Sequence, residues 1–253
     1  MLKRVRLILR EIFKDFLRRS FIEKFLITYI GCWISFLSIV LLSKLVISLS
    51  PLLIPSNPEG AIKTVEYIAV KKFETLSSTL TPYIEDSYLY YALSYFLNNS
   101  ISCIVIFLAY VLVAYLYRGE VERDPKAQGE YIDALMLLYL VTVLNPLTGI
   151  LGYRLSIEHL VVVVPHGLLE FAGLALSIVT GLTVAERIVS GDRDIFSGDV
   201  VLKIFIALIL IGLAALLEPI DWMIYYYSLY YNQDILRTLV ETYLHLGKFL
   251  SCS

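Results

Sequence analysis

The chain has 253 residues, of which 58% are hydrophobic and only 17% are charged, and its mean hydropathy is +0.74. An average soluble domain is about 45–50% apolar and about 25% charged, so this composition excludes a disordered protein, a nucleic-acid-binding tail and an ordinary cytosolic enzyme. Three cysteines cannot cross-link a chain of this length, which excludes a disulfide scaffold. The composition indicates an integral membrane protein.

The N-terminal segment carries a strong positive charge. Residues 1–24 hold eight Lys and Arg against three acidic residues, although the net charge of the whole chain is −2. The apolar residues that share one helical face there are Leu2, Val5, Leu9, Ile12 and Phe16. This pattern predicts a basic amphipathic cytoplasmic helix over residues 1–24, which either lies in the anionic lipid interface or packs beneath the membrane helices.

Five later segments are long and apolar enough to cross a bilayer, which needs about 20 apolar residues. They are Phe25–Ser43, Leu97–Tyr117, Ala134–Gly152, Leu160–Ala185 and Ile204–Trp222. The first is longer than the core of a signal peptide and no small-x-small cleavage site follows it, so we expect it to be retained as a span. The sequence therefore predicts an all-α polytopic membrane protein, a bundle of five transmembrane helices with amphipathic N- and C-terminal helices.

The spans divide the rest of the chain into a few parts. We expect one membrane domain over residues 25–234, which includes an outer segment, residues 51–96, that opens with three prolines and is compatible with a helix at its centre. Apolar residues at helical spacing predict an amphipathic segment over residues 235–253. Neither a repeat nor a low-complexity tract interrupts this plan.

The basic residues predict the orientation. Fourteen of the 21 Lys and Arg fall in residues 1–24, 118–133 and 186–203. The positive-inside rule places these three segments in the cytoplasm, so we expect a multi-pass protein of the cell membrane with a cytoplasmic N-terminus and an extracytoplasmic C-terminus. Tyrosine-rich clusters before the second span and after the fifth would then both lie at the outer interface, where aromatic rings are enriched.

Ionisable residues inside apolar spans are costly, and they are the first candidates for a site. His166 and Glu170 are four residues apart in the fourth span and would share a helical face, which His159 would join seven residues earlier. Pro165 removes a backbone donor and frees a carbonyl one turn earlier, and Gly167 makes that carbonyl approachable.

Other spans contribute polar residues near the same, outer side of the membrane. These are Asn145 in the third span, Glu218 in the fifth, and Asn98 and Asn99 at the outer mouth of the second. We expect Pro165, His166, Gly167, Glu170, Asn145 and Glu218 to form an intramembrane polar cluster.

Four interpretations of this cluster are open. Its side chains could lock helix packing, line a groove for a substrate or lipid, or relay protons, since His titrates near neutral pH. Metal-dependent catalysis is the fourth interpretation, but His-x-x-x-Glu supplies only two ligands and the His-Glu-x-x-His pattern is absent from the sequence. We therefore predict neither a catalytic residue nor a metal or other cofactor.

The run Pro165-His166-Gly167-x-x-Glu170 resembles the signature of the stage II sporulation protein M family of integral membrane proteins, in its archaeal-type form. Asn98-Asn99, Asn145-Pro146 and the stretch that ends at Glu218-Pro219 resemble the family's second, third and last helices. The resemblance covers about residues 97–222 and implies a five-span protein. The chain differs from the sporulation protein in its long outer segment and its basic N-terminal helix.

The resemblance also bears on function. In spore formers the family member is a membrane anchor for a wall-remodelling assembly and is not itself a hydrolase. We accordingly expect a non-enzymatic membrane scaffold or anchor subunit that contacts the lipid bilayer and recruits a protein partner or a second copy of itself, and that binds no nucleic acid. The alternative is a permease-like or lipid-handling protein that uses a polar groove around His166 and Glu170.

Overall fold

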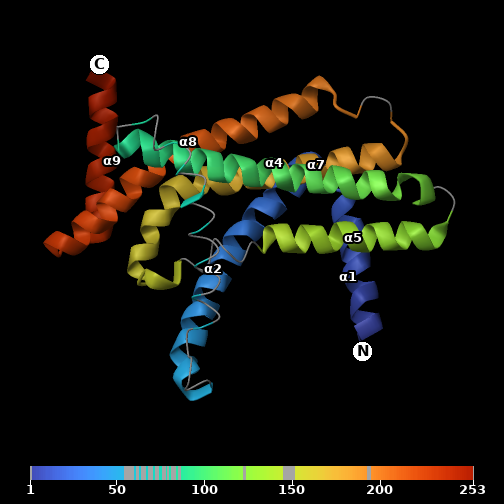
Figure 1. Ribbon diagram of the computed structural model, residues 1–253, viewed down its shortest axis with the longest axis horizontal. Helices are drawn as coiled ribbons and strands as arrows, with labels where there is room; N and C mark the ends of the chain where they lie inside the picture. Colours follow the sequence, from blue (N-terminus) through green and yellow to red (C-terminus); the bar gives the residue numbers. More distant parts are fainter. Residues whose placement is uncertain are drawn as a thin grey trace. The chain divides into compact units, whose positions relative to one another are not determined.

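The computed structural model of the chain describes residues 2–53, 87–121, 124–144, 152–192 and 195–252, together with single residues between 60 and 84. In these continuous stretches every regular element is a helix, as Figure 1 shows in chain order. The α-helices are α1 (Leu2–Leu17), α2 (Phe21–Leu53), α4 (Ser87–Val121), α5 (Pro125–Val143), α7 (Val164–Val189), α8 (Gly198–Tyr231) and α9 (Ile235–Cys252). Two short 3₁₀ helices, η1 (Gly152–Arg154) and η2 (Glu158–Val163), precede α7. The predicted all-α class is confirmed for the described residues.

Four helical segments are long and apolar enough to cross a membrane: Phe21–Leu49, Ser87–Val121, Glu158–Val189 and Gly198–Tyr231. They contain the predicted first, second, fourth and fifth spans, and each is longer than predicted because the helix continues beyond the predicted span at its ends. Apolar side chains are exposed at helical spacing along α8, at Val201, Phe205, Ile209, Leu213 and Leu216. A soluble protein rarely exposes such a stripe, and these helices make the chain a multi-pass membrane protein.

The predicted third span, Ala134–Gly152, is not among these four segments. Its first part is the second half of α5, which begins earlier than expected, at Pro125, and ends at Val143. Residues 145–151 lie outside the described residues. Most of the predicted outer segment 51–96 lies outside them too, and its two ends belong to α2 and α4.

Local sequence signals explain where two helices begin. Before α2, the Ser20 hydroxyl accepts from the Glu23 backbone N–H at 3.3 Å, while the Glu23 carboxylate accepts from the Ser20 backbone N–H at 2.9 Å. This is the reciprocal capping box of a Ser-x-x-Glu sequence. Asp124 caps α5 by accepting from the Lys126 N–H at 2.8 Å, and Pro125 follows as the first helical residue.

The chain divides into two compact units. Unit 1 comprises Met1–Ser38, Ser100–Pro146 and Phe171–Ile209, and unit 2 comprises Ile39–Asn99, Leu147–Glu170 and Leu210–Ser253. The helices α2, α4, α7 and α8 each contribute residues to both units.

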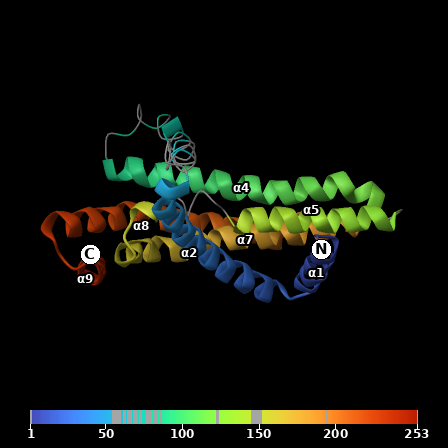
Figure 2. The same ribbon diagram turned by 90° about the horizontal axis from the view of Figure 1, so that it is seen from below.

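The core of unit 1 is built around α7. The fully buried side chains of α7 include Ile178, Val179, Leu182, Val184, Ala185 and Ile188. A Cβ atom at Gly181 would lie 2.9 Å from Cδ2 of the buried Tyr110 ring, so the close approach of α4 to α7 requires glycine here. Tyr110 also contacts α5, because its hydroxyl lies 2.9 Å from the Thr142 hydroxyl. Helices α4 and α5 lie side by side in both Figure 1 and Figure 2.

Helix α1 is attached to α5 by an ionic and an aromatic contact. The Asp133 carboxylate accepts from Arg10 Nε at 2.7 Å and from Arg6 Nε at 2.8 Å. Nearly two turns of α5 further on, the Tyr139 ring packs against Phe16, with 4.8 Å between the ring centroids. These contacts hold α1 against α5 within unit 1.

The core of unit 2 joins the segment before α7 to the C-terminal part of the chain. Its buried apolar residues are Leu155, Val162, Ile224 and Ile235, which come from the connection after η1, from η2, from α8 and from α9. Helix α9 packs against η2. This arrangement brings the start of α7, the middle of α8 and α9 to one place, where polar side chains are buried.

Candidate functional site

Three side chains from three helices form a buried polar network, which we call the His–Asp–Tyr network: His166 on α7, Asp221 on α8 and Tyr243 on α9. Nδ1 of His166 lies 2.7 Å from Oδ2 of Asp221, and the Tyr243 hydroxyl donates to Oδ1 at 2.7 Å. Asp221 is 0% exposed and His166 is 5% exposed. Both carboxylate oxygens of Asp221 therefore have a partner, as a buried charge requires.

The backbone at the start of α7 strengthens this arrangement. The His166 N–H donates a longer bond of 3.3 Å to Oδ2 of Asp221. This N–H lies in the first turn of the helix, where backbone donors lack partners within the helix and the helix dipole favours a negative charge. Asp221 thus acts on α7 from a different helix, as a capping carboxylate does from its own.

Pro165 explains why the helix starts here. It is the second residue of α7, and α7 follows directly on the 3₁₀ helix η2. Proline is favoured in the first turn of an α-helix because its missing N–H would have no partner there. The sequence predicted that Pro165 interrupts the span, and the structure has the interruption as the change from 3₁₀ to α geometry.

Two more acidic residues interact electrostatically with His166 of the network. His166 interacts electrostatically with Glu218 and Glu170, and both glutamates are half-buried. Glu170 lies one turn after His166 on α7, and Glu218 lies one turn before Asp221 on α8. The structure therefore brings His166, Glu170 and Glu218 within electrostatic range of one another.

The remaining predicted residues have separate places. Pro165 and Gly167 flank His166, and the glycine is buried. Asn98 and Asn99 are half-buried on α4, where the Asn98 amide donates to the Asn99 side-chain oxygen at 3.0 Å. Asn145 lies outside the described residues.

His159 does not join the helical face of His166. It lies in η2, where Nδ1 is 2.6 Å from the Ser156 hydroxyl and the ring packs edge-to-face on Tyr225. The expected shared face assumed an unbroken α-helix, and the 3₁₀ turns before Pro165 change the angular spacing.

Sequence reasoning did not assign Asp221 and Tyr243 to the cluster. Asp221 carries a usable signal, since it lies three residues after Glu218, on the same helical face of an apolar span. Tyr243 is one of 19 tyrosines, and only the packing of α9 against η2 identifies it.

The network fixes which groups donate hydrogen bonds to the Asp221 carboxylate. Burial and then the hydrogen bond to Asp221 raise the pKa of Tyr243, so its hydroxyl keeps its proton and donates. The carboxylate likewise favours a proton on Nδ1 of His166, which sets the tautomer of the ring. Among the described residues, no group of three or more His, Cys, Asp or Glu side chains is arranged to hold a metal ion.

The chain is similar to the uncharacterized protein MJ0096 of Methanocaldococcus jannaschii. The two are 34% identical over 249 residues, which cover 95% of each chain. No family model matches the chain, and no solved structure matches it.

Proposed function

We propose that this chain, which belongs to the same family as the uncharacterized protein MJ0096 of Methanocaldococcus jannaschii, is a non-enzymatic scaffold or anchor subunit of the cell membrane that recruits protein partners. The observation that carries the proposal is the His–Asp–Tyr network. Its hydrogen bonds run between His166, Asp221 and Tyr243 themselves and join three helices. A polar network of this kind fixes helix positions, which is the requirement of a scaffold.

Exposed tyrosines at the end of α8 support the recruitment of a partner. Tyr226, Tyr227, Tyr230 and Tyr231 are exposed by 65%, 47%, 82% and 57%. Tyrosine is enriched in protein interfaces because it offers a large, rigid contact area and a hydroxyl for hydrogen bonding. We call these four side chains the tyrosine face and propose that it contacts the protein partner or a second copy of the chain.

The finer topology is part of the proposal. We infer five spans, the third being completed by the residues that follow α5, with the N-terminus in the cytoplasm and the C-terminus outside. The basic residues of 1–24, 118–133 and 186–203 support this orientation. Membership of the stage II sporulation protein M family, proposed from the run Pro165–Glu170, agrees with the five spans.

The test is purification of the tagged chain from its native membrane in mild detergent. A partner or a second copy should co-purify in a fixed stoichiometric ratio. Replacing Tyr230 and Tyr231 by alanine should release it without lowering the melting temperature of the chain. The matched control is Tyr115→Ala, because Tyr115 is an exposed tyrosine of α4 at 48%, and it should leave the complex intact. A monomeric chain without any stoichiometric partner would contradict the proposal.

One observation favours the second candidate, a permease-like or lipid-handling protein. Glu170 and Glu218 are only half-buried within apolar helices, beside His166. Carboxylates in such positions are typical of substrate and proton pathways. In that case Glu170→Gln and Glu218→Gln would abolish uptake of a substrate or movement of lipid in proteoliposomes while leaving the melting temperature unchanged. If they lower the melting temperature instead, their role is in helix packing.

A further inference from the structure

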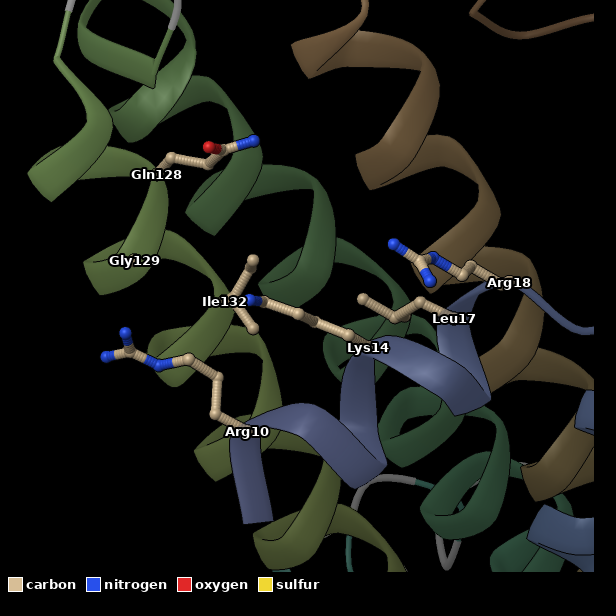
Figure 3. A pocket seen from close by; sticks show the side chains of 7 residues that line it. All are labelled: Arg10, Lys14, Leu17, Arg18, Gln128, Gly129 and Ile132. Atoms are coloured by element: carbon tan, nitrogen blue, oxygen red, sulfur yellow. The ribbon is translucent and has the colours of Figure 1, made fainter. Parts of the chain in front are cut away.

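We propose that a cavity between α1 and α5 binds the phosphate group of an anionic membrane lipid. The cavity belongs to unit 1 and has a volume of about 400 Å³. Figure 3 shows three basic side chains around it, Arg10 and Lys14 of α1 and Arg18 directly after that helix, with residues of α5 completing the wall. This site is distinct from the His–Asp–Tyr network, and the proposal does not rest on the scaffold function.

The charge of the cavity wall is positive. Its seven lining residues include three cations and no carboxylate. Beside the cavity, the partly buried Asp133 carboxylate accepts from both Arg6 and Arg10. Two guanidinium groups thus share one carboxylate, and an excess positive charge remains beside the cavity.

Lys14 and Arg18 are available to an anion. Lys14 contacts Glu11 at 2.7 Å and Arg18 contacts Asp15 at 3.8 Å, each within one turn of the same helix. Both acidic partners are exposed to solvent, by 66% and 73% of their side chains. Exposed pairs of this kind add little stability, so a phosphate, which binds guanidinium and ammonium groups through several charge-assisted hydrogen bonds, competes with them readily.

Helix α5 supplies a second set of features. The exposed Gln128 side chain lines the cavity with an amide that can donate to a phosphate oxygen. Gly129 leaves room for Arg10, since a Cβ atom there would lie 3.0 Å from Nη1 of the guanidinium. A side chain at this position would require the end of the Arg10 side chain to shift.

Apolar surface around the cavity identifies the phosphate as that of a lipid. Leu17 and Ile132 line the cavity itself. Val5, Ile8, Leu9 and Ile12 of α1 are exposed by 45%, 53%, 42% and 60% and lie on the opposite side of the helix from Arg10 and Lys14. A membrane that covers this stripe brings lipid phosphates within reach of the basic side chains of the same helix. Basic side chains beside an apolar stripe on one short helix are typical of a helix that lies in the lipid interface.

The experiment uses the full chain in phosphatidylcholine nanodiscs that contain a minor fraction of phosphatidylglycerol. Native mass spectrometry after release into detergent counts the lipids that stay bound. The wild-type chain should retain one phosphatidylglycerol in preference to phosphatidylcholine. The double variant Lys14→Gln, Arg18→Gln should weaken this retention about tenfold or more, because each basic residue near an anionic lipid contributes about 1 kcal/mol.

Two controls separate a specific site from general attraction. The double variant Arg118→Gln, Lys126→Gln removes the same charge from exposed positions of the neighbouring segment 118–133 that do not line the cavity. It should keep the bound lipid, and an equal loss in both double variants would overturn the site. Inorganic phosphate should fail to displace the lipid at millimolar concentration. Displacement would show that the site takes a soluble phosphate, and it would overturn the assignment to a lipid.

Discussion

Tyr243 donates a hydrogen bond of 2.7 Å to Asp221, although 22 residues and a helix end separate them in the chain. The tyrosine lies on α9 and the aspartate on α8, and the other oxygen of the same carboxylate holds His166 at the start of α7. One carboxylate that is 0% exposed thereby connects three helices. The stability of this end of unit 2 should depend on it.

Removing the tyrosine hydroxyl should destabilise the protein measurably. Tyr243→Phe keeps the ring and leaves Oδ1 of Asp221 without its donor, so we expect the free energy of unfolding to fall by about 1–2 kcal/mol. The measurement is thermal unfolding of the purified chain in detergent. Tyr230→Phe is the matched control, since Tyr230 is 82% exposed, and it should leave the melting temperature unchanged.

The effects of substitutions at Asp221 and Tyr243 should be coupled. In Asp221→Asn both hydrogen bonds change at once, so adding Tyr243→Phe should cost less than it costs in the wild-type chain. A double-mutant cycle on the free energy of unfolding measures this difference. Additive losses would mean that the two residues stabilise the fold independently, against the geometry of the network.

The packing of α7 against α4 gives a steric prediction. Gly181→Ala puts a Cβ atom 2.9 Å from the Tyr110 ring and 3.1 Å from Tyr110 Cβ, which cannot move without the backbone. We expect a loss of about 1–3 kcal/mol in the free energy of unfolding, as in other overpacked cores.

Gly119→Ala is the control for helix propensity. A Cβ atom at exposed Gly119 of α4 meets nothing within 4 Å, so this change should be neutral or stabilise the chain by up to about 1 kcal/mol. If both variants behave alike in thermal unfolding, the close approach at Gly181 is not what limits the packing.

The polar site shows how far the sequence could predict the molecule. Apolar runs are long, so four membrane-spanning helices follow from hydropathy alone, and ionisable residues in such runs are conspicuous, which led to His166, Glu170 and Glu218. The partner that His166 contacts most closely is Asp221. Helical spacing relates residues of one helix, whereas this contact depends on how two helices pack, and no periodicity encodes that.

The start of α7 is a second feature that the sequence could predict only in part. Proline predicts an interruption, but it does not reveal that the preceding turns are 3₁₀, which places His159 beside Ser156 and Tyr225 instead of His166. The sequence does not predict the attachment of α1 to α5 either. The sequence allows this basic helix either to lie in the lipid interface or to pack beneath the membrane helices, and only the fold shows that Arg6 and Arg10 bind Asp133.

Topology is testable through the number of spans. Five spans place the two termini on opposite sides of the membrane, whereas four place them on the same side. We expect a fluorescent protein fused after residue 253 to stay dark and alkaline phosphatase fused there to be active, because the C-terminus is proposed to be outside. Fusions at the N-terminus, which the basic residues of 1–24 should keep in the cytoplasm, provide the internal control.

The ion pairs of Asp133 should make the attachment of α1 sensitive to acid. Hydrogen bonding from Arg10, and then from Arg6, lowers the pKa of Asp133 below its usual value near 3.8, although partial burial opposes the shift. Because the folded-state pKa lies below that of the unfolded chain, the stabilisation is fully present above about pH 5 and is lost as the pH falls through the folded-state pKa. Asp133→Asn should remove this contribution, about 1–3 kcal/mol at neutral pH.

The pH dependence separates this contribution from that of other carboxyl groups. The difference in melting temperature between the wild-type chain and Asp133→Asn should be constant above about pH 5 and should shrink toward zero below about pH 4. Glu130→Gln, on the same helix but in an exposed pair with Lys126 at 3.8 Å, should change the melting temperature little at any pH. A wild-type advantage that persists unchanged in acid would mean that Asp133 stabilises α1 through packing and not through its charge.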